Sequence, residues 1–356
     1  MTQPTGVLAN SHPALAHAWH PVGIVADIAA YVDQIGRPYA TQIAGAGWAL
    51  CVLGGQWVAL PDRCPHRRVK LSAGRIVGDE VECGYHGWRF DGAGACTAVP
   101  ALGDTAPPRG MGTTAAFGVV ERYGWLWVAP AQPVTDLPVF AEADDPAYAW
   151  GLCPPVRTTA PAGIVADNFF DVAHFSYLHQ KTFNISKPVT VERYAVSRAG
   201  WRTELVHETE LHEDIGGESR VATYTATAPL AMHLRLDYPQ TGERTAVVLI
   251  AQPESDGSTV IHKAVAVPAS GGPGLLRQHI DFEVDVINED IDMMENTVEP
   301  WLPLDLRLEA HTKADRAGVE LRKMLSDFCA AASAMDAGPI RTASLDSAGS
   351  PALESA

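Results

Sequence analysis

The chain has 356 residues, of which 47% are hydrophobic and 19% charged, a composition typical of a globular protein with room for two domains. Its formal net charge is −16, which argues against nucleic acid and anionic membrane surfaces as partners. The apolar runs are shorter than the ~20 residues of a membrane-spanning helix, and residues 1–18 show no secretory signal. We therefore expect a cytoplasmic protein whose six cysteines form no disulfide framework.

The first third of the chain predicts a small antiparallel β domain. Short strand-like segments separated by glycine-rich turns run from Trp19 to about Ala131. We expect residues 1–16 to form an N-terminal arm and residues 17–133 to form this domain. The stretch 131–162 is rich in Pro and Ala and predicts a linker, with the domain boundary near residue 134.

The rest of the chain predicts an antiparallel sheet with long helices, so the expected fold class is α+β. Helices are expected at 163–178, 275–297 and 310–333, and alternating strand segments across 190–268. These elements would form a second domain over residues 134–334. Residues 335–356 consist mostly of small and polar residues, which predicts a disordered tail.

Two segments of the first domain each offer one cysteine and one histidine: Cys64-Pro65-His66-Arg67 and Cys83-Gly84-Tyr85-His86-Gly87-Trp88. Two Cys on one iron and two His on the other form the ligand set of a Rieske [2Fe-2S] cluster. Structural zinc is the alternative, because two Cys and two His also bind zinc. The neighbouring Gly, Tyr and Trp residues favour the cluster, since they let the backbone close over the sulfurs and supply hydrogen bonds to them.

With these segments, C-P-H-R and C-x-Y-H-G-W, the chain resembles the Rieske non-heme iron oxygenases. Val69 and Tyr85 stand where Rieske proteins of respiratory complexes carry disulfide-forming cysteines, which points to the oxygenase branch. The resemblance implies a helix-grip catalytic domain after the Rieske domain. It also implies that four residues bind the [2Fe-2S] cluster: Cys64, His66, Cys83 and His86.

A second candidate metal site lies in and after the helix expected at 163–178. Two His and one carboxylate on one face of Fe(II) form the facial triad of non-heme oxygenases. Asn168, Asp171 and His174 are spaced by three and so share one helical face. His179 would lie ~140° from His174 on an ideal helix. The helix must therefore end or bulge between the two histidines if both are to bind one ion.

The five-residue spacing of His174 and His179 is by itself weak evidence for a metal site, because His12/His17 and His207/His212 have the same spacing. The segment around His207 and His212 alternates like a strand, so the two side chains would point to opposite faces. We expect His207 in a pocket or the core and His212 near solvent.

The segment that runs from Asn168 to His179 is similar to the mononuclear-iron motif of the Rieske oxygenases. The resemblance implies that His174 and His179 bind the iron and that Asn168 lines the site. It also implies that Asp171 accepts a hydrogen bond from a cluster histidine and so links the two metal centres.

The third iron ligand is expected on the helix at 275–297. The family pattern, Glu-Asp followed five residues later by Glu, matches at Asp290. Asp292 is the alternative, and it lies about 200° around the helix from Asp290. Thr297 stands where the family often has Gln, a small departure from the pattern.

The resemblance implies an oxygenase component of the vanillate O-demethylase and dicamba monooxygenase type. Such a protein uses O2 to hydroxylate or O- or N-demethylate a small aromatic or polycyclic molecule. No G-x-G-x-x-G follows a strand and opens a helix, so electrons are expected from a separate ferredoxin or flavin reductase. The resemblance also implies a homotrimer. The alternatives are a steroid ring hydroxylase of the same family and, in another class, an electron carrier or a zinc-stabilised binding module.

Two further groups of residues have a functional and an ordinary explanation. The segment 63–75 holds five basic residues and no acidic one, and it is either a solvated loop or a docking site for an acidic electron donor: Arg63, Arg67, Arg68, Lys70 and Arg75. Five residues of the second domain are either substrate-pocket residues or ordinary packing: Phe169, His233, His262, His279 and Phe282.

Overall fold

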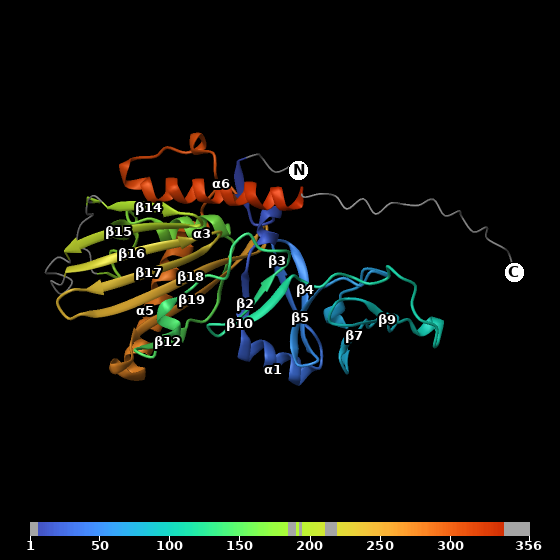
Figure 1. Ribbon diagram of the computed structural model, residues 1–356. Helices are drawn as coiled ribbons and strands as arrows, with labels where there is room; N and C mark the ends of the chain where they lie inside the picture. Colours follow the sequence, from blue (N-terminus) through green and yellow to red (C-terminus); the bar gives the residue numbers. More distant parts are fainter. Residues whose placement is uncertain (1–5, 184–189, 192–193, 211–218, 338–356) are drawn as a thin grey trace.

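The computed structural model in Figure 1 describes residues 6–183, 190–191, 194–210 and 219–337. All strand pairs described are antiparallel, and six helices accompany them in this part of the chain. The predicted α+β class is confirmed. His212 lies outside the described residues, as does the predicted tail except for its first three residues.

The N-terminal half contains three small sheets, with strand orders β3-β4-β5, β10-β11-β2 and β6-β7-β8-β9. The strand-like segments expected between Trp19 and Ala131 all form strands. Their bounds are β2 (His20–Ile24), β3 (Tyr39–Ile43), β4 (Ala46–Leu53), β5 (Gln56–Pro61), β6 (Arg75–Val77), β7 (Glu80–Glu82), β8 (Arg89–Phe90), β9 (Cys96–Ala98), β10 (Gly118–Arg122) and β11 (Trp125–Ala129).

Helix α1 (Val25–Ile35) was not predicted. Its buried side chains, Ile28 and Val32, lie one turn apart and join the core of the first half. Gly36 ends the helix with a φ of 66°, a left-handed conformation that glycine adopts without strain.

The C-terminal half is built on one eight-stranded sheet, ordered β12-β19-β18-β17-β16-β15-β14, with β13 also paired to β19. The strands are β12 (Tyr148–Leu152), β13 (Val156–Thr158), β14 (Ala195–Ala199), β15 (Arg202–Glu210), β16 (Ser219–Thr227), β17 (Ala231–Tyr238), β18 (Glu243–Ser255) and β19 (Ser258–Pro268). The stretch 131–162, expected to link the domains, also contributes β12 and β13, which pair with β19 at the edge of the sheet.

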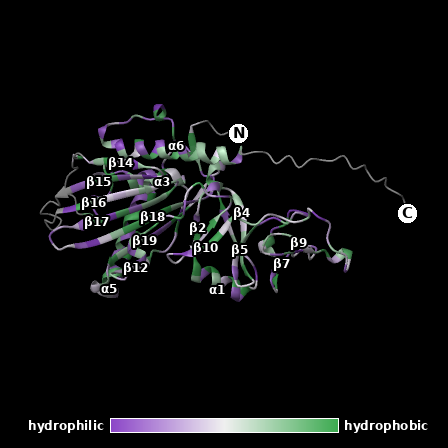
Figure 2. Ribbon diagram, in the orientation of Figure 1, coloured by the Kyte–Doolittle hydropathy of each residue, from purple (hydrophilic) through white to green (hydrophobic). Residues whose placement is uncertain are grey.

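Helices cover this sheet. They are α2 (Ala141–Asp144), α3 (Ala162–Phe170), α4 (Phe175–Leu178), α5 (Gly272–Met294) and α6 (Arg316–Asp336). Helix α5 lies against β19 and β12, α6 lies along β14 and β15, and α3 contacts β18. Hydrophobic residues dominate β18 and β19 in Figure 2, where most side chains are buried. The sheet and helices thus enclose one large core.

The N-terminal arm joins the second half. Strand β1 (Val7–Ala9) is buried and pairs with β20 (Trp301–Pro303). Trp125 and Trp127 of β11 are fully buried against Val248 of the large sheet. The two halves therefore share a hydrophobic core, and the proposed domain limits, 17–133 and 134–334, stay predictions. In the described ranges, no helix has the length and apolar character needed to cross a membrane.

Candidate metal sites

The two Cys/His loops share one backbone pattern. Cys64 N–H donates to Val69 O at 2.8 Å, and Arg68 N–H donates to Cys64 O at 2.9 Å. In the second loop, Cys83 N–H donates to Trp88 O at 2.8 Å, and the amide four residues after Cys83 donates back to Cys83 O at 3.0 Å. The fourth residue after each cysteine has a positive φ. Two equivalent turns thus face each other across the end of the domain.

The two cysteines are buried and the two histidines are more exposed, the pattern expected of a cluster at the tip of a domain. Cys64 and Cys83 are 1% and 2% exposed, whereas His66 is half-buried and His86 exposed. The two histidine rings are 4.6 Å apart between centroids. Burial raises the pKa of the Cys64 thiol to about 11, although backbone N–H groups, among them that of His66, hydrogen-bond its sulfur and oppose the rise. A metal is needed to hold this buried sulfur as a thiolate.

The pairing of these four residues favours a cluster over zinc. A tetrahedral zinc ion, with bonds of roughly 2.0–2.3 Å, needs all its ligand atoms within about 4 Å of one another. In the described part of the chain, a single group of three or more metal-binding side chains has all its ligand atoms within 4.8 Å, and it includes none of these four. The Cys64 side chain contacts that of Cys83, and the two imidazole rings are adjacent. This pairing of Cys with Cys and His with His is the one that a Rieske cluster needs, with two Cys on one iron and two His on the other.

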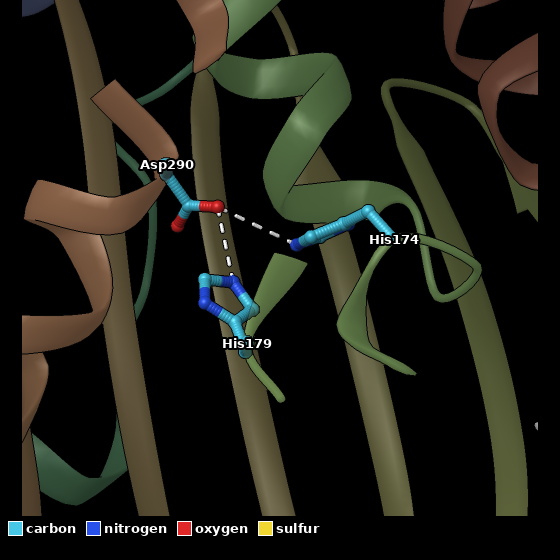
Figure 3. Close-up of side chains that lie close together, drawn as sticks. All are labelled: His174, His179 and Asp290. Atoms are coloured by element: carbon cyan, nitrogen blue, oxygen red, sulfur yellow. Dashed lines mark ion pairs between the residues drawn. The ribbon is translucent and has the colours of Figure 1, made fainter. Parts of the chain in front are cut away.

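That single compact group consists of His174, His179 and Asp290. Figure 3 shows both imidazoles directed at the Asp290 carboxylate. The Nε2 atoms of His179 and His174 lie 3.1 Å and 3.5 Å from Asp290 Oδ1. His179 is fully buried, and its Nε2 makes no hydrogen bond within the described residues. Two histidines and one carboxylate with converging ligand atoms fit a facial-triad metal site.

The local backbone makes this convergence possible. Helix α3 ends at Phe170, and Asp171 is extended, with φ −91° and ψ 131°. His174 and His179 flank the short helix α4 as its N-cap and C-cap residues. The expected continuous helix at 163–178 was therefore wrong, and Asp171 and His174 do not share a helical face with Asn168. The break between α3 and α4 lies before His174; between the two histidines, α4 has only four residues and ends at Leu178, so both imidazoles lie outside a continuous helix.

Carboxylates surround the two histidines. Asp171 Oδ2 lies 3.4 Å from His174 Nδ1, and Asp171 also accepts hydrogen bonds from the backbone of Ala173 and His174. Glu289 Oε2 lies 2.8 Å from His179 Nδ1. Burial alone would lower the pKa of His179, but Asp290 and Glu289 outweigh it and raise that pKa. The site therefore attracts a cation.

Of the remaining predicted site residues, Asn168 contacts this group and Asp292 does not. Asn168 Nδ2 donates to Asp290 Oδ1 at 3.3 Å, so it borders the site. Asp292, the alternative ligand, is exposed and outside the converging group. Sequence analysis missed Glu289, although it directly precedes Asp290.

The other histidine pairs have structural partners. His17 hydrogen-bonds Gln132 O and Asp336, and His12 accepts a hydrogen bond from the Ala14 backbone. His207 is half-buried on β15 and contacts the ring of Tyr194.

Ring contacts connect one of the five candidate pocket residues, Phe282, to the metal site. Phe282 contacts Phe183, whose ring lies 5.6 Å from that of His179, so Phe282 belongs to the surroundings of the metal site. Phe169 contacts Tyr224. His233 pairs with buried Glu142 and His262 contacts Trp125, in the core shared with the first half. His279 is half-buried on α5.

The five basic residues of the first Cys/His loop are all exposed. Arg75 pairs with Glu82 at 2.6 Å. The other four make no ion pair with any residue that the structure describes: Arg63, Arg67, Arg68 and Lys70. Unpaired positive charge therefore surrounds the end of the domain that bears the cluster loops.

Two family models match the chain: the Rieske [2Fe-2S] domain over residues 18–115 and the vanillate O-demethylase oxygenase C-terminal domain over residues 158–331. Methylxanthine N1-demethylase NdmA of Pseudomonas putida is 28% identical over 330 residues, covering 90% of this chain and 91% of that protein. The oxygenase component of 3-ketosteroid-9-alpha-monooxygenase of Rhodococcus rhodochrous is 30% identical over 332 residues, covering 88% and 81%. The solved structure of Pseudomonas putida CBB5 NdmA with caffeine superimposes with a TM-score of 0.79 at 26% identity, covering 90% and 93%.

A Rieske domain joined to an antiparallel-sheet domain with a converging His, His and carboxylate group defines an iron-dependent oxygenase. The chain belongs to the Rieske oxygenases and is an oxidoreductase of the monooxygenase type. Its cofactors are a [2Fe-2S] cluster and a mononuclear non-heme iron. Its relatives demethylate or hydroxylate small molecules.

Proposed function

We propose that this chain is the oxygenase component of an electron-transfer system and that it removes a methyl group from nitrogen or oxygen of a small aromatic molecule. The observation that carries the proposal is the convergence of His174, His179 and Asp290 on one point in a Rieske oxygenase. The similarity to a methylxanthine demethylase along 90% of the chain supports demethylation over other monooxygenase reactions.

The residues would share the work as follows. Cys64, Cys83, His66 and His86 would hold the cluster, and His174, His179 and Asp290 would hold the iron. When bound, the iron supplies O2 activation and oxygen insertion into a C–H bond. A methyl group hydroxylated on N or O then loses formaldehyde, so demethylation and hydroxylation need the same protein chemistry.

Aromatic side chains next to the proposed iron ligands support a flat substrate. The rings of Phe175 and Phe183 lie 5.5 Å and 5.6 Å from that of His179, and Phe282 extends this group along α5. Aromatic faces stabilise a planar ring by stacking and burial. The steroid alternative has its own support in the 30% identity to a 3-ketosteroid monooxygenase component.

We also propose a homotrimer in which the cluster of one copy serves the iron of the next. The cluster-bearing part of the chain, around β7 and β9, lies at one end of the molecule, away from α3 and α5 (Figure 1). Asp171 is 36% exposed and lines an open cavity of about 360 Å³ together with Asn168 and Met293. Met293 is 59% exposed, and exposed apolar side chains at such a rim favour a protein contact.

Electrons would reach the cluster from a separate reductase or ferredoxin with an acidic surface. The unpaired basic residues beside the cluster loops, such as Arg67 and Lys70, would attract it. None of the six cysteines, all of which lie in the described residues, forms a disulfide, which supports the proposed cytoplasmic location.

The decisive experiment measures formaldehyde release and O2 uptake by the anaerobically purified protein with NAD(P)H and a surrogate reductase. Methylxanthines and methoxylated aromatics are compared with 3-ketosteroids, and a His174→Ala variant serves as the control. Formaldehyde released in step with O2 uptake supports the proposal. A hydroxylated steroid without formaldehyde favours the alternative. Two irons per chain and no substrate-dependent O2 uptake would leave only an electron carrier.

A further inference from the structure

Glu289 makes the shortest polar contact to the proposed iron ligand His179. Its Oε2 lies 2.8 Å from His179 Nδ1, and its Oε1 accepts a hydrogen bond from Thr182 Oγ1 at 2.5 Å. His179 is 0% exposed, whereas the Glu289 side chain is 28% exposed. The carboxylate therefore reaches from the edge of the domain onto the outer nitrogen of a buried ring.

Two consecutive acids of α5 thus hold one imidazole from both sides. Asp290 Oδ1 faces Nε2 at 3.1 Å, while Glu289 faces Nδ1. An ionised carboxylate can only accept, so the Nδ1 atom must carry the proton. The lone pair of His179 is then left on Nε2, the atom directed at Asp290 and His174 (Figure 3).

We propose that Glu289 is a positioning residue for the mononuclear iron: it fixes the tautomer and ring angle of His179, and Thr182 fixes Glu289. The inference rests on the proposed role of His179 as an iron ligand. A carboxylate on the far nitrogen strengthens a histidine ligand, and its loss typically costs about 10- to 100-fold in metal affinity.

The competing explanation is structural, in which Glu289 only ties the segment after α4 to α5. Both explanations predict some loss of stability when Glu289 is removed. Only the positioning role predicts weaker metal binding in a protein that is still folded, with partial rescue by a neutral side chain that still accepts a hydrogen bond from Nδ1–H.

The test uses the full chain with its cluster intact and the mononuclear iron removed anaerobically by a chelator. Co(II) is titrated into this protein, and its affinity and visible d–d spectrum are recorded. Glu289→Ala is compared with Glu289→Gln, and Asp292→Asn is the matched control, because Asp292 is an exposed acid on the same helix. His179→Ala locates the titrated site.

We expect Glu289→Ala to bind Co(II) about 10- to 100-fold more weakly, with an altered d–d spectrum. Glu289→Gln should lie nearer the unmodified protein, and Asp292→Asn should match it within about twofold. Affinity and spectrum for Glu289→Ala equal to those of Asp292→Asn would overturn the proposal, as would a Gln variant no better than the Ala variant.

Cluster absorbance and circular dichroism report whether each variant folds. If Glu289→Ala does not fold, Thr182→Val carries the test, because it removes one hydrogen bond from Glu289 and leaves the carboxylate. A weaker Co(II) affinity in Thr182→Val supports the proposal, and an unchanged affinity overturns it. Co(II) binding needs neither substrate nor reductase, so a failure to find a demethylase substrate leaves this result interpretable.

Discussion

His262 should make the stability of this protein depend on pH in the mildly acidic range. The side chain is 1% exposed, and neither ring nitrogen has a hydrogen-bond partner in the described residues. It contacts Trp125 and pairs across the sheet with Ile250. Burial, with a smaller effect of Arg157, lowers its pKa to about 3. The imidazole is therefore neutral in the folded protein well below pH 6.

The sign and size of the effect follow from the two pKa values. In the unfolded chain the pKa of His262 is about 6.5, so its imidazole becomes protonated as the pH falls below this value. In the folded chain the same imidazole stays neutral over this range. Stability is fully present above pH 6.5 and decreases below it by about 1.36 kcal/mol per pH unit. Between pH 7.5 and pH 4.5, two units below the unfolded pKa, the loss is about 2.7 kcal/mol.

The assay compares urea unfolding of the unmodified protein and His262→Leu at several pH values. Leucine fills a similar volume in this apolar surrounding and cannot be protonated. His20, whose pKa burial lowers to about 4, contributes equally to both proteins and cancels in the comparison. The two stability curves should separate by about 2.7 kcal/mol over this range. Parallel curves, within about 0.5 kcal/mol, would refute the reasoning.

Three further predictions concern the proposed electron path and its support. Asp171→Asn should retain both metal centres and normal cluster reduction but lower turnover by about 100-fold or more, as measured by metal analysis and stopped-flow; near-normal turnover would contradict the bridging role. The double variant Arg67→Glu with Lys70→Glu should slow the reduction of the cluster by an acidic donor and weaken the dependence of that rate on ionic strength. An unchanged rate would mean that these residues form a solvated loop with no docking role. Arg322→Met should lower the free energy of unfolding by about 3 kcal/mol, because the buried Arg322 binds Asp167 through two hydrogen bonds. Urea unfolding measures this change, and a decrease below about 1 kcal/mol would show that the pair is weakly coupled.

The candidate residues of both sites could be proposed from the sequence because most of their chemistry lies in short motifs, and the resemblance to the Rieske oxygenases added Asp290 to His174 and His179. Cys64 to His66 and Cys83 to His86 are each contained in one turn. The helical geometry of the second motif also predicted that the helix must end or bulge between His174 and His179, and α4 ends there, at Leu178. The structure has a second, unpredicted break before His174, at Asp171. The position of that break did not follow from composition, since no Pro or Gly marks it.

Contacts between distant residues did not follow from local patterns, and Asp290 was joined to His174 and His179 only through the family resemblance. Glu289 and His179 are 110 residues apart, and Arg322 and Asp167 are 155 apart. Their pairing depends on where α5 and α6 lie on the sheet, which periodicity does not fix. Helix α1 is a different case: Ile28 and Val32 supply helical spacing, but the short segment between two strands carries no N-cap side chain, so the usual signal for a helix start was missing.

The exposure of the proposed site residues indicates how the metal ligands can be shielded from water while the electron path remains open to other proteins. The proposed ligands that must keep a metal away from water, Cys64, Cys83 and His179, are at most 2% exposed. The residues at which an electron would arrive or leave, His86 and Asp171, are reached from solvent. His86 lies in the loop after β7 and Asp171 directly follows α3, and Figure 1 shows β7 at one end of the molecule, away from α3. This arrangement supports the proposed transfer of the electron from the cluster of one copy to the iron of the next. Under the proposed function, the contact between copies is as much a part of the active site as the side chains that hold the iron.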